Sequence, residues 1–260
     1  MFNFKKKYGQ NFLKDKNIVN KIATSITPLD NNIVIEIGCG DGRLTSRLCE
    51  LYDNVLGYEI DKELESILAV NLKDYSNKKI IFDDFLNRNL ALDLEEYKGK
   101  NIYVIANLPY YITTPILEKL IESNLDIKAI TVMVQKEVGD RFSAKVGTKE
   151  YSSLSVYLNY YFNIKKLFVV SRNCFIPSPN VDSIVIRFEA LENLNYLKNK
   201  ELFFKLVRDS FRFKRKTLKN NLKYYDLDKI DLVLKKYNLD LSVRAEQLSL
   251  DIFCDIANNL

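Results

Sequence analysis

Short apolar runs alternate with helical patterns along the first two thirds of the 260-residue chain. Each run is bounded by Gly, Asn, Asp or Pro and is followed by apolar residues spaced three or four apart, the pattern of a strand that leads into a helix. Strands are predicted at 33–37, 54–58, 79–82, 102–106 and 129–134, and helices at 16–27, 44–51, 61–72 and 115–122. This alternation predicts a mostly parallel sheet with helices on both faces.

The pattern changes after residue 150. Further strands are expected at 157–162, 166–171 and 183–189, the last two antiparallel across the loop at 175–179. Beyond residue 192 only helical spacing remains, near 200–212, 215–224, 228–237, 242–247 and 249–258. We therefore predict an α/β catalytic domain over residues 1–190, with a basic N-terminal arm at 1–15, and a small all-helical domain over 191–260.

Composition excludes several classes of protein. With 47% hydrophobic and 28% charged residues the chain can form a core and remain soluble, and no apolar stretch approaches the roughly 20 residues of a membrane span. The N-terminus lacks the apolar stretch of a signal peptide, and the four cysteines have no metal-ligand or redox spacing. A cytoplasmic protein without membrane or metal is expected. The chain has no histidine, so His-based triads and imidazole metal sites are excluded.

Positive charge is concentrated towards the C-terminus. Residues 205–223, here called the basic segment, contain eight basic residues and one acid, Asp209. Such an excess favours a polyanionic partner, although a solvated helix face would carry the same charges. Phe211 and Phe213 interleave with the cations, which favours RNA slightly unless both belong to the core. The residues expected to contact RNA phosphates are Arg212, Lys214, Arg215, Lys216 and Lys219.

A glycine-rich loop at residues 38–42, here called the glycine loop, joins the strand at 33–37 to the helix at 44–51. Glycines allow a sharp turn and close approach of a ligand to the backbone. The dinucleotide fingerprint G-x-G-x-x-G would require glycine at position 43, which is Arg43, so NAD is disfavoured. A cofactor site and a merely structural turn both remain open.

Acidic residues follow the next two predicted strands. Glu59 stands where a carboxylate can accept hydrogen bonds from both hydroxyls of a ribose. Asp83 and Asp84 stand where an acceptor can bind the exocyclic amine of adenine. We prefer Asp84, although its neighbour leaves the assignment ambiguous by one position and a turn residue is the alternative. Together with the glycine loop, these positions resemble the S-adenosylmethionine site of class I methyltransferases, which have a Rossmann-like fold. The resemblance implies that Gly38 and Gly40 approach the methionine part of the cofactor.

The run Asn107-Leu108-Pro109-Tyr110 ends the strand predicted at 102–106, where open α/β sheets place their ligands. It resembles the target-base motif of amino-directed nucleic-acid methyltransferases, although a simple strand-to-helix turn is possible. The Asn107 side-chain oxygen and the Leu108 carbonyl can each accept one N–H of an adenine amine and direct its lone pair at a methyl donor. Pro109 would hold these acceptors in place beforehand. Tyr110 can stack on an extruded base.

Seven ordered blocks resemble the KsgA-type small-subunit rRNA dimethyladenosine transferases. They are K-Y-G-Q-N-F-L (7–13), E-I-G-C-G-D-G-R-L-T (36–45), N-L-P-Y-Y-I-T-T-P-I-L (107–117), M-V-Q-K-E-V-G-D-R-F (133–142), Y-S-S-L-S-V (151–156), F-I-P-S-P-N-V-D-S (175–183) and F-R-F-K-R-K-T-L (211–218). The resemblance implies that S-adenosylmethionine is held by Asn11, Leu13, Gly38, Glu59, Asp84 and Asn107, and the target base by Asn107, Leu108 and Tyr110. The chain departs from the family pattern at Cys39, where Pro is usual, and at Tyr111, where Asn is commoner.

Members of this family add two methyl groups to the amine of each of two adjacent adenosines, which lie in a hairpin loop near the 3′ end of 16S rRNA. The resemblance therefore implies 16S rRNA within an immature 30S subunit as the partner, and a monomeric enzyme is expected. An Erm-type transferase acting on 23S rRNA shares the cofactor and base motifs, but the blocks at 151–156 and 175–183 and the helical C-terminal part favour the small-subunit enzyme. A non-catalytic 30S assembly factor is the alternative from another class.

Overall fold

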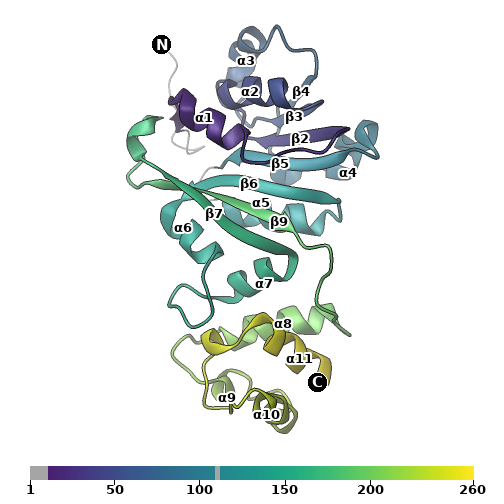
Figure 1. Ribbon diagram of the computed structural model, residues 1–260, viewed down its shortest axis with the longest axis vertical. Coiled ribbons are helices and arrows are strands. Elements are labelled where there is room, and N and C mark those ends of the chain that lie inside the picture. The colour runs from purple at the N-terminus through teal and green to yellow at the C-terminus, as the bar shows by residue number, and fades with distance from the viewer. Residues whose placement is uncertain (1–10, 109–111) are drawn as a thin grey trace. The chain divides into compact units, whose positions relative to one another are not determined.

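The computed structural model describes residues 11–108 and 112–260. Seven of the described strands form one sheet in the order β4-β3-β2-β5-β6-β9-β7 (Figure 1), and β1 pairs with β8 in a separate two-stranded sheet. The strands span Phe12–Leu13 (β1), Asn32–Ile37 (β2), Val55–Tyr58 (β3), Lys78–Ile81 (β4), Asn101–Asn107 (β5), Ile127–Gln135 (β6), Phe162–Val170 (β7), Phe175–Ile176 (β8) and Ser183–Ala190 (β9). The pairings among β4, β3, β2, β5 and β6 are parallel, and β9 is antiparallel to β6. The predicted mostly parallel α/β sheet is confirmed.

Helices follow most of the strands, as the alternating pattern predicted. The α-helices span Lys16–Ala23 (α1), Arg43–Leu51 (α2), Glu65–Asn71 (α3), Leu90–Asp93 (α4), Thr113–Glu122 (α5), Lys136–Phe142 (α6), Ser153–Tyr161 (α7), Lys200–Ser210 (α8), Leu218–Asn221 (α9), Leu227–Lys236 (α10) and Leu250–Asn259 (α11). Short 3₁₀ turns span Lys62–Leu64 (η2), Phe85–Asn87 (η3), Glu95–Tyr97 (η4), Arg172–Cys174 (η5) and Ala245–Gln247 (η6).

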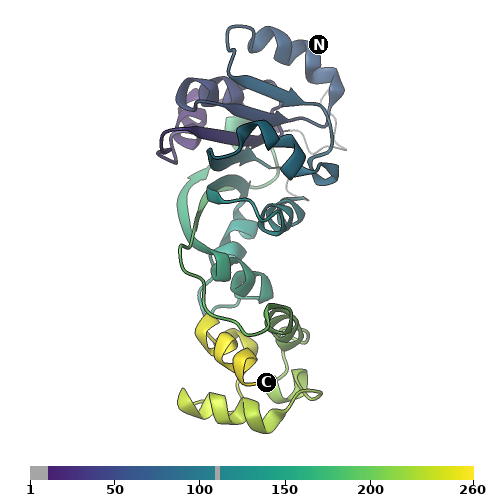
Figure 2. The same ribbon diagram turned by 90° about the vertical axis from the view of Figure 1, so that its right-hand side faces the viewer.

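Helices cover both faces of the sheet (Figure 2). Side chains of α1 and α2 form one buried cluster with alternate residues of the strands, among them Val34, Tyr103 and Met133. The opposite face carries Tyr58, whose hydroxyl donates to Asp93 on α4 at 3.0 Å and whose ring packs edge-on against Phe85 of η3. All six residues of β2 are buried, as expected for a strand covered on both sides.

Helix α1 is shorter than the pattern at 16–27 predicted. The carboxylate of Asp15 accepts hydrogen bonds from the first backbone N–H groups of the helix and fixes its start. The helix ends at Ala23, and Ile26 is buried beyond it in an irregular segment that leads to Pro28. The apolar spacing at 16–27 thus extends beyond the helix because Ile26, although it is not helical, is also buried in the core.

The strand predicted at 157–162 is wrong, because residues 153–161 form helix α7. Aromatic and β-branched residues favour strands locally. Ser152 and Ser155 instead form a capping box that starts a helix, and the rings of Tyr157 and Tyr160 pack at 4.9 and 5.6 Å from the ring of Phe204 on α8. Strand β7 begins only at Phe162, the last residue of the predicted strand.

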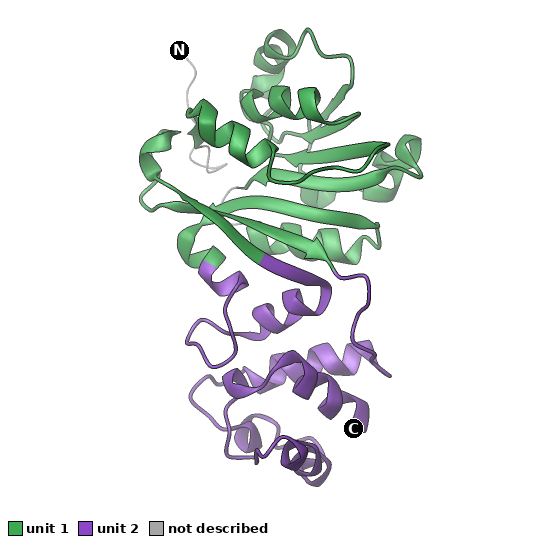
Figure 3. Cartoon of the chain, in the orientation of Figure 1, with its two compact units in different colours: residues 1–139, 165–190 green, residues 140–164, 191–260 purple. Residues whose placement is uncertain are grey.

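The chain divides into two compact units (Figure 3). The first unit comprises residues 1–139 and 165–190, and the second comprises 140–164 and 191–260. The second unit has its own core, built from α7, α8, α9, α10 and α11, with Phe203, Leu234 and Phe253 fully buried. Residues 140–164 thus belong with the C-terminal helices, whereas the sequence placed them in the domain over 1–190. Physically, the aromatic residues of α7 have their packing partners on α8.

Candidate active site

The predicted site residues lie at one edge of the sheet in the first unit. Strands β2, β3 and β4 are in register at their carboxyl ends, where Ile37 lies beside Tyr58 and Tyr58 beside Ile81. The glycine loop, Glu59 and the pair Asp83-Asp84 follow these ends directly. On the other side of β2 lies β5, whose last residue is Asn107. Strands β3 and β4 lie on one side of β2, and β5 and β6 lie on the other, so the strand order reverses at β2. The carboxyl edge at this point is a topological switch point, where open α/β sheets bind ligands.

The glycine loop turns through left-handed backbone conformations, with φ of +81° at Gly38, +57° at Gly40 and +84° at Gly42. Glycine adopts these values freely because it has no Cβ. A Cβ on Gly38 would point at the backbone oxygen of Asn107, 3.7 Å away, so the loop closely approaches the end of β5. A Cβ on Gly40 would overlap the ring of Phe12 at 2.7 Å. The loop therefore fits tightly between the end of β5 and the Asn11–Leu13 segment.

Glu59 links the glycine loop to the following turn. Its Oε2 accepts from the backbone N–H of Gly40 at 2.8 Å, and its Oε1 accepts from that of Asp61 at 2.9 Å. The side chain is 5% exposed, and burial raises the pKa of its carboxyl, an effect partly opposed by these two hydrogen bonds. Each oxygen has a second lone pair, so the carboxylate can still accept from ligand hydroxyls.

Glu36 lies near the end of β2, just before the glycine loop, and no role was predicted for it from the sequence. It is 1% exposed, and neither of its carboxylate oxygens has a hydrogen-bond partner among the described residues. Burial raises its pKa to about 8; the nearby hydroxyl of Thr45 opposes the shift, and the charge of Glu59 adds to it. Its position inside a fully buried strand was the available sequence signal, since a carboxyl group there is costly unless it is neutral or paired.

Asp83 and Asp84 have different surroundings. Asp83 forms an ion pair with Arg88 at 3.1 Å, and hydrogen bonds from Arg88 lower the pKa of the Asp83 carboxyl. Asp84 instead starts η3, with its Oδ1 accepting from the backbone N–H of Leu86 at 2.9 Å. Among the residues that the structure describes, its Oδ2 receives only a long contact of 3.5 Å, from Asn87. Asp84 therefore has more acceptor capacity available for a ligand than Asp83, which is already paired with a cation.

Asn107 ends β5 and is half-buried. Its Nδ2 donates to the backbone oxygen of Asn11 at 3.3 Å, which leaves the Oδ1 of the same amide as an acceptor. Leu108 is buried, and its N–H donates to the oxygen of Met133 on β6 at 3.2 Å. The structure thus brings Asn107, Leu108 and Asn11 together at the edge of the sheet. Pro109 and Tyr110, the other two residues of the predicted motif, and Tyr111 lie outside the described residues.

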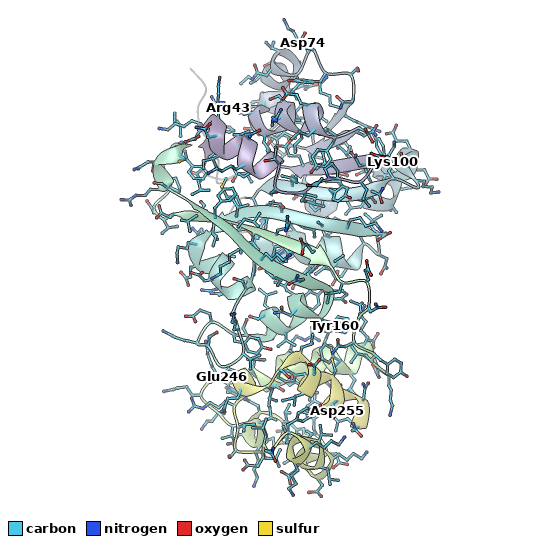
Figure 4. The ribbon with its side chains drawn as sticks, viewed as in Figure 1. Arg43, Asp74, Lys100, Tyr160, Glu246 and Asp255 are labelled. Carbon is cyan, nitrogen blue, oxygen red and sulfur yellow. The ribbon has the colours of Figure 1, made fainter. Side chains whose placement is uncertain are left out.

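The segment Asn11–Leu13 is held against the site from two sides. Strand β1 pairs with β8, with Leu13 opposite Phe175. Arg43, labelled in Figure 4 at the start of α2, donates from Nη1 to the backbone oxygen of Leu13 at 3.3 Å and forms an ion pair with Asp41. Arg43, which the sequence used only to exclude a dinucleotide fingerprint, thus joins the N-terminal segment to the glycine loop.

This arrangement fits a nucleoside cofactor such as S-adenosylmethionine. The glycine loop offers a close backbone approach, and Glu59 and Asp84 offer acceptors beyond neighbouring strands. The described residues contain no group of three or more acidic or cysteine side chains arranged to hold a metal ion.

The residues predicted to bind RNA lie in the second unit, not at this edge. Arg212, Lys214, Arg215, Lys216 and Lys219 are all exposed. In the second unit they lie around the turn that leads from α8 to α9. No helix within 11–108 and 112–260 combines the length and the low charge needed to span a membrane.

Comparison with known proteins gives the family. The model of the ribosomal RNA adenine dimethylase family matches residues 1–260. The Ribosomal RNA small subunit methyltransferase A of Alkaliphilus oremlandii is 43% identical over 265 residues, covering 100% of this chain and 92% of the relative. A crystal structure of a dimethyladenosine transferase from Plasmodium falciparum has a TM-score of 0.80 at 27% identity, covering 94% of this chain and 95% of the other. The 23S rRNA methyltransferase ErmE has a TM-score of 0.79 at 23% identity, covering 96% and 99%, which shows a shared fold alone.

The fold and the site thus define a class I methyltransferase. The chain belongs to the ribosomal RNA adenine dimethylase family, as the seven sequence blocks predicted. It is an S-adenosylmethionine-dependent rRNA adenine methyltransferase.

Proposed function

We propose that this protein dimethylates the N6 amines of two adjacent adenosines in the hairpin loop near the 3′ end of 16S rRNA. The proposed substrate is 16S rRNA within an immature 30S subunit, which places the enzyme in the cytoplasm. We also propose that the enzyme is a monomer. The observation that carries the proposal is the close approach of Asn107, at the end of β5, to the glycine loop. It places the residue that carries the proposed amide acceptor against the glycine loop, through its backbone oxygen, in a chain whose relative is named for the small subunit.

We assign the cofactor to the edge of the first unit. Gly38 and Gly40 accommodate the methionine part, Glu59 accepts from the ribose hydroxyls, and Asp84 accepts from the adenine amine. Asn11 and Leu13 close the site from the N-terminal side, and the backbone oxygen of Asn107 contributes from β5. The bound cofactor supplies an electrophilic methyl group on a sulfonium sulfur.

The chain's own residues prepare the target amine. The adenine amine is a poor nucleophile because its lone pair is delocalised into the ring. The Oδ1 of Asn107 and the backbone oxygen of Leu108 each accept one N–H, which favours a tetrahedral nitrogen with its lone pair directed at the donor. We assign positioning of this loop to Pro109 and stacking on the base to Tyr110. The methylated amine is a cation and loses its proton to solvent, so no histidine is needed.

The test is methyl transfer to unmethylated 30S particles by Asn107→Ala, with radiolabelled cofactor. Turnover is expected to fall by about 100-fold or more, on the scale of losing one transition-state hydrogen-bonding group. Cofactor binding, measured by calorimetry, should persist because the backbone oxygen of Asn107 is retained. Asn101→Ala, at the opposite end of β5, is the matched control and should keep full turnover. Undiminished turnover by Asn107→Ala would contradict the assignment.

The substrate is tested separately by offering the wild-type enzyme 30S particles, naked 16S rRNA and 23S rRNA. The label should enter 16S rRNA at the two adjacent adenosines. Label found only in 23S rRNA would establish the Erm-type alternative. Binding to 30S particles with no transfer to any RNA would establish the assembly-factor alternative.

We assign the phosphate contacts of the RNA to Arg212, Lys214, Arg215, Lys216 and Lys219. Such contacts fix the position of the RNA and do not select its sequence. Each contact makes the fall of log affinity with log salt concentration steeper by about 0.7 to 0.9. Reversing the charge of Lys214 and Lys216 together should lower affinity for 30S particles and reduce that slope by about 2. Unchanged binding would mean that the phosphate contacts lie elsewhere.

A further inference from the structure

The exposed cations of the basic segment are not neutralised within the protein. Among the described residues, none of its eight basic side chains forms an ion pair with an acidic group. Its one acid, Asp209, accepts a hydrogen bond from the hydroxyl of Tyr225 at 2.7 Å. No acidic side chain among the described residues pairs with these cations; the Nζ of Lys214 donates to the backbone oxygen of Lys149 at 2.6 Å, which does not cancel its charge.

Two aromatic side chains are exposed among these cations. The side chain of Phe213 is 56% exposed and that of Tyr224 is 86% exposed. Their aromatic neighbours face inwards, since the ring of Phe211 lies 6.0 Å from those of Tyr151 and Phe253. The two phenylalanines that the sequence treated alike therefore have opposite surroundings. Phe211 belongs to the core of the second unit, and Phe213 does not.

Phe213 and Tyr224 both stand in turns attached to α9. The Oδ1 of Asn221, the last residue of α9, accepts from the N–H of Phe213 at 3.1 Å, and its Nδ2 donates to the oxygen of Ser210 at 2.7 Å. Tyr224 lies in the turn closed by a hydrogen bond from the N–H of Tyr225 to the oxygen of Leu222 at 2.8 Å. These hydrogen bonds hold both turns in advance of partner binding, which lowers the ordering cost of binding.

A cation accompanies each exposed ring. The guanidinium of Arg212 lies 5.5 Å from the ring centroid of Phe213, and the Nζ of Lys223 lies 4.8 Å from that of Tyr224. A ring beside a cation matches a nucleotide, which offers a flat base and a phosphate a short distance apart. Single exposed aromatics are ordinary on protein surfaces. Two of them, each with its own cation, one inside an unneutralised basic segment and the other directly after it, indicate a ligand with both features.

We propose that Phe213 and Tyr224 are stacking positions for unpaired bases, so that the basic segment binds looped or single-stranded rRNA in preference to continuous duplex. The proposal rests on the proposed rRNA substrate and names the kind of RNA that this surface binds. A continuous A-form duplex keeps its bases stacked on one another and offers only phosphates and groove edges. An unpaired base has a free face for Phe213 or Tyr224, while Lys214, Lys216 and Lys219 bind the flanking phosphates.

The chain has no tryptophan, so Phe213→Trp introduces a single indole as a fluorescent reporter. The variant is titrated with an RNA hairpin and with a fully paired duplex that carries the same number of phosphates. Hairpin binding should quench the indole through base stacking, and duplex binding should not. Tyr196→Trp is the matched control, because Tyr196 is also exposed, at 74%, in the second unit but lies outside the basic segment. Its emission should not change with either RNA.

Affinity gives the second measurement. Phe213→Ala and Tyr224→Ala should each weaken hairpin binding by about 5-fold or more, on the scale of one lost base stack, and leave duplex binding and the salt slope unchanged. Equal losses for hairpin and duplex, or no loss for either, would overturn the proposal. Methyl transfer by the wild type and the salt dependence set by Lys214 and Lys216 would stand in that event, so failure here is distinguishable from failure of the proposed function.

Discussion

At the scale of single residues, the cofactor edge depends on side chains that fit closely around the glycine loop. Cys39, which stands where the family usually has proline, is buried, and its thiol lies 3.6 Å from the backbone oxygen of Tyr58. It packs with Leu64 and Leu68. Cys39 thus fills space between the glycine loop and the segment formed by η2 and α3.

Gly57 is expected to be intolerant of a side chain. A Cβ there would lie 2.5 Å from the Sγ of Cys39 and 2.6 Å from the Cδ1 of Ile80. The Ile80 methyl can rotate away, but Cys39 is short and fixed in the glycine loop. Gly57→Ala should destabilise the protein by about 1–3 kcal/mol, as overpacking usually does, and weaken cofactor binding. Thermal unfolding and calorimetry measure both effects. Gly99→Ala, where a Cβ would contact nothing within 4 Å but a φ of +80° strains any side chain, is a control for the cofactor affinity and not for stability.

Glu36 is expected to make stability depend on pH. Its pKa is about 8 in the folded protein against an ordinary value of 4.5, so between these values the folded state binds more protons than the unfolded state. The free energy of unfolding should therefore fall as the pH rises from about 5 to 8, with a limiting slope of about 1.4 kcal/mol per pH unit from this group.

The carboxyl of Glu59, whose pKa is also raised by burial, adds a slope of the same sign. Glu36→Gln cannot titrate at this position, so denaturant unfolding of this variant at pH 5, 6, 7 and 8 should give a shallower slope than the wild type. Equal slopes for the two proteins would show that Glu36 is ionised in the folded state.

At the scale of elements, the turn between α8 and α9 depends on Asn221. Its side chain bonds to the backbone of both Ser210 and Phe213, which ties the end of α8 and the turn after it to the last residue of α9. Asn221→Ala should lower the free energy of unfolding of the second unit by about 1 kcal/mol, because the half-buried backbone oxygen of Ser210 loses its partner.

Asn221→Ala should also weaken RNA binding without altering the slope against salt, since no charge changes. The comparison is with Asn220→Ala, an exposed neighbour whose side chain contacts the hydroxyl of Thr217 at 3.0 Å. A loss of salt slope in Asn221→Ala would show that the turn sets the number of phosphate contacts as well as their position.

At the scale of the whole molecule, the chain has two units with separate cores. The proposed cofactor residues all belong to the first unit. A ligand that binds only the folded first unit stabilises it by about 2.7 kcal/mol at a hundred times its dissociation constant. Hydrogen exchange with and without S-adenosylhomocysteine should therefore show slower exchange at residues 36–42, 57–61 and 104–108, and unchanged rates in α10 and α11. Protection spread equally over both units would contradict this division.

The order of strands and helices in the α/β region followed from the sequence alone. Apolar runs of strand length, helical spacing and glycine or acidic residues at the strand ends are local features, and parallel strands bring their carboxyl ends to one edge. Glu59, Asp84 and Asn107 could therefore be singled out from their positions along the chain, and the family blocks indicated the class of reaction. Their individual roles stay predictions that the proposed variants test.

Tertiary packing decided what local pattern left open. Residues 153–161 form a helix because their aromatic rings pack on α8, and the same packing places 140–164 in the second unit. The complete burial of Glu36, the pairing of β1 with β8, and the opposite surroundings of Phe211 and Phe213 depend on residues distant in the sequence. Periodicity records which residues avoid water, but not which distant surface covers them, and only the folded chain supplies that surface.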